Sequence, residues 1–197
     1  MKYCLTFFIF NIFSLVYSQC EYSLVELNNS TEKATIKSYP FTLDLVETPL
    51  NGRILLASLI RTGNQYFIEL EITEDSSSRN LKPICLESGS RISFLLKNNS
   101  TFSLPHVNDK ICGVRTYDRK SGYTTVSNYG KFILTPSSFD QLLKSEITLI
   151  KIIDNDFNKS FVIKNELKEP LDNGYRIINP SRFFIDNINC MINPKFE

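Results

Sequence analysis

Alternating apolar and polar residues on both sides of Gly63-Asn64 constrain the fold of this chain more than any other feature. If Gly63 and Asn64 form a two-residue turn, the numbers of facing residues in the hairpin of residues 53–72 sum to 127. This register pairs Leu59 with Ile68, Ala57 with Leu70 and Leu55 with Ile72 on one side, and Ser58 with Glu69 on the other. A slip of one residue would move the apolar side chains to the solvent face. The sequence therefore predicts an antiparallel hairpin in one register.

A second hairpin is predicted over residues 90–106. A three-residue loop at residues 98–100 would place Phe94 opposite Leu104 and Leu96 opposite Phe102. Pro105 has no N–H to donate, so we expect its strand to end there or to lie at a sheet edge.

Further strands are expected at residues 39–46, 123–134, 147–153 and 161–164, which are rich in β-branched and aromatic residues. Thr135-Pro136 is typical of a helix start and predicts a short helix with Phe139, Leu142 and Leu143 on one face. A second helix is expected near the end, with Phe184, Ile188 and Met191 at helical spacing. The fold class is therefore mainly β: a single antiparallel β-sandwich or open barrel with two short helices.

The N-terminus has the pattern of a secretion signal. Lys2 precedes an apolar run at residues 5–16, and Val16 and Ser18 supply small side chains three residues and one residue before a cut at Gln19. We expect residues 1–18 to be a signal peptide and residues 19–197 to be one β-rich domain, with no transmembrane segment in the mature chain. The alternative, an uncleaved membrane anchor, is disfavoured because the apolar run is short.

Export predicts a secreted or periplasmic protein. Cys20 raises an alternative, a lipid-anchored envelope protein, because a cysteine just after a signal can accept lipid in bacteria. Gln19 disfavours it, since such sites want a small residue before the cysteine.

Of the 5 cysteines, Cys4 lies in the predicted signal, so four remain in the mature chain. An even number in an exported chain indicates disulfides. Cys85 and Cys112 flank the second hairpin, where Cys85 would face Gly113 and a single bulge would bring the sulfurs together. Cys20 and Cys190 are then the expected second pair.

Charge and motifs exclude several classes of function. Without Lys2 the chain has 21 basic and 21 acidic residues, and this balance argues against nucleic acid as a partner. No nucleophile motif, phosphate-binding loop or metal-ligand cluster is present, so we assign no catalytic, cofactor or metal site.

His106 is the one histidine of the chain. We expect it to be a surface or turn residue. The alternative makes it the base of a small secreted hydrolase, with a serine and a carboxylate brought near by folding, or assigns such activity to paired carboxylates.

Residues 115–131 form the richest candidate binding surface, because Tyr and Arg side chains favour recognition. Its members are Arg115, Tyr117, Arg119, Tyr123 and Tyr129. The alternative is an ordinary hairpin with half-buried tyrosines.

The block at residues 131–152, a strand followed by a short helix and another strand, resembles segments of small uncharacterised exported β-rich proteins of Gram-negative bacteria. The resemblance implies no activity. The expected function is a non-enzymatic binding or assembly module of the cell envelope or extracellular space, with a protein or another envelope component as partner.

Overall fold

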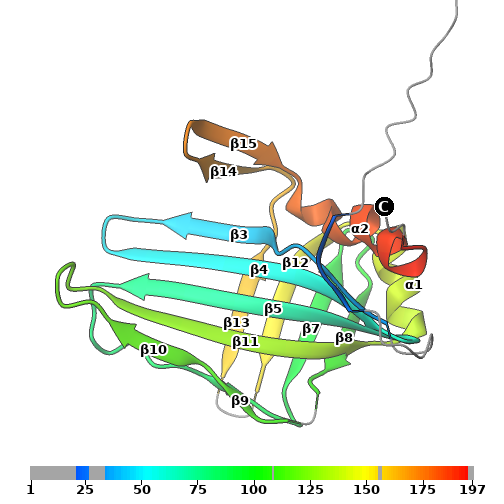
Figure 1. Cartoon of the computed structure of the whole chain (residues 1–197), viewed down its shortest axis with the longest axis horizontal. Coiled ribbons are helices and arrows are strands. Elements are labelled where there is room, and N and C mark those ends of the chain that lie inside the picture. The colour runs from blue at the N-terminus through cyan, green and yellow to red at the C-terminus, as the bar shows by residue number, and fades with distance from the viewer. Residues whose placement is uncertain (1–20, 27–33, 108, 155–156, 195–197) are drawn as a thin grey trace, which may run out of the picture.

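The computed structural model describes residues 21–26, 34–107, 109–154 and 157–194, and it shows two antiparallel sheets packed face to face (Figure 1). Two short helices lie together at one end of the sheets. The predicted class, a mainly β antiparallel sandwich or open barrel with two short helices, is confirmed, and the described strands do not close into a barrel.

The larger sheet contains the first predicted hairpin. Its strands run in the order β1 (Tyr22–Glu26), β2 (Thr35–Ser38), β4 (Asn51–Thr62), β5 (Gln65–Ser76), β11 (Thr124–Leu134) and β10 (Val114–Tyr117). Strand β3 (Phe41–Glu47) lies on the same side of β4 as β2 and pairs with the first half of β4, while β2 pairs with its end. Leu59 faces Ile68 and Ala57 faces Leu70, as predicted, and all four side chains are buried. The alternation around Gly63-Asn64 therefore fixes the centre of this sheet.

The smaller sheet has the strand order β13 (Asn158–Val162), β12 (Ile147–Ile153), β7 (Arg91–Leu96) and β8 (Thr101–Pro105). The predicted register of β7 and β8 is wrong by two residues: Phe94 faces Phe102, with ring centroids 5.1 Å apart, and Ile92 faces Leu104. The side chains predicted to face the core still do so, because a register shift of two residues keeps each side chain on the same face of the sheet.

The loop chemistry explains this shift. Asn99 has a φ of 64°, the left-handed conformation that three-residue hairpin loops place at their third position. The loop is therefore residues 97–99, not 98–100. Asn98 Oδ1 accepts hydrogen bonds from the backbone N–H and the hydroxyl of Ser100, which fixes the loop from within.

Both predicted helices form. In α1 (Pro136–Lys144), the Thr135 and Ser138 side chains cap the first turn reciprocally, and Leu142 is fully buried. A short 3-10 helix, η1 (Pro180–Arg182), leads into α2 (Phe183–Ile192). From α2, Phe183 and Phe184 enter the core, where the Phe184 ring lies edge-on to that of Phe94 at 5.7 Å.

Two small two-stranded sheets complete the described part of the chain: β6 (Cys85–Leu86) pairs with β9 (Ile111–Cys112), and β14 (Leu167–Leu171) pairs with β15 (Gly174–Ile178). The β14–β15 hairpin projects past β3 at one edge of the molecule (Figure 1). None of the helices in these residues is long and apolar enough to cross a membrane.

Candidate functional site

The residues predicted as one binding surface are divided between different contacts. Arg115 and Tyr117 lie on β10, where both hold the loop that follows β5. The Arg115 guanidinium donates to the Arg79 carbonyl at 2.6 Å, and Arg79 donates to the Tyr117 hydroxyl at 2.8 Å while its guanidinium lies over the Tyr117 ring. These two side chains therefore fasten a loop of their own chain.

The other three members lie elsewhere. The Tyr123 hydroxyl donates to the Pro49 carbonyl at 2.7 Å and so joins the ends of two hairpins. Tyr129 lies on the face of β11 opposite to Val126, and its hydroxyl donates to Glu71 at 3.3 Å. Arg119 is exposed in the β10–β11 turn. Arg115 and Tyr117 thus contact Arg79, whereas Tyr123 and Tyr129 contact Pro49 and Glu71.

His106 is buried, contrary to the expectation of a surface or turn residue. Its side chain is 2% exposed, and its ring lies edge-on to that of Phe132 with centroids 5.4 Å apart. The reason is that β8 ends beside β11, where His106 forms an antiparallel bridge with Phe132. Burial lowers the pKa of His106 from its ordinary value of 6.5, because desolvation penalises the charged ring.

A serine and a carboxylate lie near this histidine but do not form a triad with it. The Ser90 hydroxyl donates to Asp154 at 2.7 Å and accepts from the Glu87 N–H at 2.8 Å. Neither ring nitrogen of His106 makes a hydrogen bond of good geometry. A hydrolytic triad requires the hydroxyl to donate to the imidazole, so the hydrolase alternative gains no support from this arrangement.

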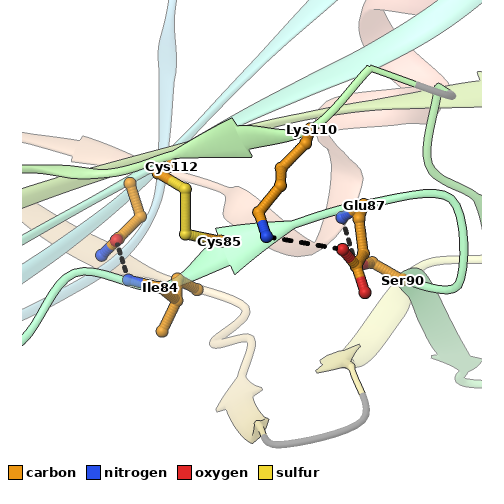
Figure 2. The surroundings of a disulfide bond; sticks show 7 residues. Ile84, Cys85, Glu87, Ser90, Lys110 and Cys112 are labelled. Atoms are coloured by element: carbon orange, nitrogen blue, oxygen red, sulfur yellow. Dashed lines mark hydrogen bonds and ion pairs between the residues drawn. A yellow bond between two sulfur atoms is a disulfide. The ribbon is translucent and has the colours of Figure 1, made fainter.

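The predicted Cys85–Cys112 disulfide is present. The two cysteines face each other directly in the β6–β9 pair, so the expected bulge is not needed (Figure 2). Lys110 and Glu87 form an ion pair at 3.7 Å beside the bond. Cys112 is exposed and Cys85 is half-buried.

The disulfide-bonded strands cover one end of the core. Leu86 of β6 is 2% exposed, and a Cβ on Gly130 would lie only 2.6 Å from its Cδ1 atom. Gly130 therefore provides the space that Leu86 fills. The Asn128 side chain fixes the approach of β6, because its Oδ1 accepts from the Ile84 N–H at 2.8 Å.

Several predictions fall on residues outside the described part of the chain. These are the signal peptide of residues 1–18, lipidation of Cys20 and the Cys20–Cys190 pair. Cys190 is itself disulfide-bonded. Among the residues that the structure describes, no group of three or more His, Cys, Asp or Glu side chains could hold a metal ion.

The candidate functional site is one face of the projecting β14–β15 hairpin. In its register, Lys168 faces Ile177 and Pro170 faces Tyr175, so these four side chains share one face, named here the hairpin face. Tyr175 is 60% exposed and Ile177 is 59% exposed. The Lys168 ammonium lies 5.0 Å from the centre of the Tyr175 ring.

The opposite face attaches the hairpin to the larger sheet. Leu167 and Ile178 are buried, and Glu169 accepts a hydrogen bond from the Thr42 hydroxyl of β3 at 2.5 Å. Arg176 donates to the same carboxylate at 2.5 Å. The hairpin face is thus held outward by contacts made on its reverse side.

The sequence interpretation missed this hairpin. Asn173-Gly174 is a turn signal between two apolar stretches. Leu171 pairs with Gly174, whose φ of 135° suits glycine, and this closes a turn at Asp172 and Asn173. The strand was missed because Pro170 is unfavourable inside a strand and because charged residues interrupt the apolar residues of the segment 164–172.

No protein-family model, curated protein or solved structure matches this chain. The resemblance to exported bacterial proteins therefore stays a prediction.

Proposed function

We propose that this chain is an exported, non-enzymatic binding or assembly module that contacts a protein partner of the envelope or extracellular space through the hairpin face. The observation that carries the proposal is the exposure of Tyr175 and Ile177 side by side on a projecting hairpin. Tyr is enriched at protein interfaces because its ring supplies apolar area and its hydroxyl supplies a polar contact.

The anchoring of the hairpin supports this proposal. Glu169 joins Thr42 to Arg176, so the reverse side of the hairpin is engaged before any partner arrives. A surface that is ordered in advance loses less conformational entropy on binding. Fully burying a large apolar side chain contributes about 1.5–3 kcal/mol, so the two exposed side chains are suited to be the centre of an interface.

The compartment is proposed from the predicted signal and from the disulfide. Cys85–Cys112 is compatible with an oxidising environment, where such bonds form and persist. Mass spectrometry of protein recovered from the native host should find an N-terminus at Gln19. An intact Met1 on a cytosolic product would contradict export, and a diacylglyceryl group on Cys20 would support the lipid-anchored alternative.

The hairpin face can be tested by site-specific crosslinking in the native host. A photoreactive residue at position 177 should yield a crosslinked product of defined mass, and Tyr175→Ser in the same chain should reduce its yield. Val162 of β13 is the matched control position, because it is 68% exposed on the other sheet. Equal products from positions 177 and 162 would contradict the proposal, as would a yield that Tyr175→Ser leaves unchanged.

A further inference from the structure

His106 lies where backbone hydrogen bonds join the two sheets of the sandwich. Its N–H donates to the Ser90 carbonyl at 3.0 Å, and the Val107 N–H donates to the Lys131 carbonyl of β11 at 2.9 Å. His106 also forms the bridge with Phe132. Through these bonds the end of β8 is held against the larger sheet. These five residues are named here the sheet junction.

The imidazole is enclosed in the sheet junction, and its nearest polar groups do not satisfy its nitrogens with well-formed hydrogen bonds. It is 2% exposed, packs edge-on against Phe132, and neither nitrogen has a hydrogen bond of good geometry. Even the neutral ring is costly to bury in the sheet junction, because its one N–H and its one acceptor nitrogen lose their hydrogen bonds to water. A protonated ring would be a buried cation whose N–H groups lack hydrogen bonds of good geometry, which is much less favourable.

The acidic groups that face His106 are Asp109, from the loop after β8, and Asp154, from the end of β12. Both carboxylates and the Val107 backbone raise the pKa of His106, but burial outweighs them and the net shift is downward. Asp154 also accepts a hydrogen bond from Ser90, which holds it within the surrounding network.

The other charged groups on the neighbouring elements are directed elsewhere. The Lys131 ammonium lies over the Phe67 ring, 4.2 Å from its centre. Glu87 pairs with Lys110 beside the disulfide, and Arg91 of β7 is exposed. His106 is therefore the group in the sheet junction whose charge state conflicts with its position.

We propose that His106 makes the sheet junction an acid-sensitive latch, in which protonation of the imidazole releases the end of β8 from β11. The proposal is independent of the function assigned to the hairpin face. Because the pKa of His106 is lower in the folded protein, its contribution to stability is complete above pH 6.5. That contribution is lost as the pH falls below 6.5 toward the folded-state pKa.

The Cys85–Cys112 bond limits what can open. His106 lies inside the loop that this disulfide closes, so both ends of the released segment stay tethered to each other. We therefore expect local opening at the sheet junction rather than loss of the whole fold. Local openings of this kind are detected by amide hydrogen exchange.

The test measures hydrogen exchange of the mature, disulfide-intact protein at about pH 7.5 and about pH 5, corrected for the intrinsic exchange rate. Peptides that contain Val107 should lose protection by about tenfold or more at the lower pH, while β4 and β5 stay protected. His106→Leu should remove this extra loss. Equal protection at both pH values would overturn the latch, and so would the same acid-dependent loss in His106→Leu.

A second measurement keeps the proposal falsifiable if His106→Leu does not fold. The chain has one histidine, so its ring resonances in a nuclear magnetic resonance titration are unambiguous. In the unmodified protein the ring should titrate below pH 6.5, in step with the exchange of the Val107 amide. A ring that titrates at or above 6.5, or that titrates without any change in exchange, would refute the latch.

Discussion

Removal of the Cys85–Cys112 disulfide is the sharpest test of how this sandwich is stabilised. The double substitution Cys85→Ser, Cys112→Ser deletes the bond while leaving the β6–β9 backbone pair and the Cys190 bond in place. Substitution is preferable to a reductant, because a reductant would also attack the bond of Cys190.

The magnitude follows from the length of the closed loop. The two cysteines are separated by 27 residues. In the chain-entropy account, releasing a loop of this length costs about 3.5 kcal/mol of stability at 25 °C. For a chain of this size, 1 kcal/mol shifts the melting temperature by about 2–4 °C, so the expected fall is about 7–14 °C.

Thermal unfolding of both proteins, followed by circular dichroism at one concentration and pH, measures this difference. Non-reducing peptide mapping must first show the Cys85–Cys112 peptide pair in the parent protein. A melting temperature that falls by less than about 2 °C would refute the reasoning, because even half of the loop-closure term exceeds that shift.

Three further changes have defined outcomes. Gly130→Ala places a Cβ 2.6 Å from Leu86 Cδ1, so the neighbouring core side chains must shift. The free energy of unfolding, measured with urea, should therefore fall by about 1–3 kcal/mol. Asn128→Ala removes the acceptor of the Ile84 N–H and should lower the free energy of unfolding by about 1–3 kcal/mol in the same assay. The Lys97 hydrogen bond lowers the pKa of Glu146, so the stability that Glu146 adds is complete above pH 4.5 and is lost as the pH falls through its folded-state pKa. Lys97→Ala should therefore weaken the pH dependence of unfolding below 4.5.

Each change has a control. Leu86→Ala should relieve part of the cost of Gly130→Ala, the rest coming from the Phe132 ring, so strictly additive effects of the two substitutions would contradict the steric explanation. In Asn128→Ala the Ile84 amide should lose hydrogen-exchange protection, and unchanged protection there would contradict the hydrogen bond as the cause. Lys82→Ala, at an exposed lysine, should leave the pH dependence below 4.5 as in the parent, and an equal change in both lysine variants would contradict the role of Lys97.

The sequence predicts the β4–β5 hairpin well because its side chains sort correctly in one register only. Around Asn98 and Asn99 the prediction fails by two residues, because the predicted loop puts Ser100 at the left-handed third position, which Asn99 takes instead. The error is not visible in the hydrophobic pattern, since the inward-facing set is the same in both registers. A local pattern therefore predicts which face of a strand is buried more reliably than it predicts which residues form the loop.

The contacts of the predicted binding surface and of His106 could not be read from the sequence in the same way, whereas the turn at Asn173-Gly174 was a readable signal for the hairpin of the candidate site. Tyr117 and Tyr123 have the composition of a recognition surface, but their hydroxyls contact Arg79 and Pro49, which are distant in the sequence. His106 is buried by β11, a strand that follows it in the chain. These positions depend on tertiary contacts, and no local pattern encodes them.

The path of the chain between the two sheets has a consequence for folding kinetics. Strand β11 pairs with β5 across 48 to 68 residues, from Ser76 opposite Thr124 to Tyr66 opposite Leu134. During synthesis the β4–β5 hairpin can close early, but the free edge of β5 must wait until β7, β8 and β10 have emerged. Pairing over such separations is slow, because the loop entropy is lost before the contacts form. We therefore expect slow folding, with a long unpaired β5 edge as the species most prone to aggregate.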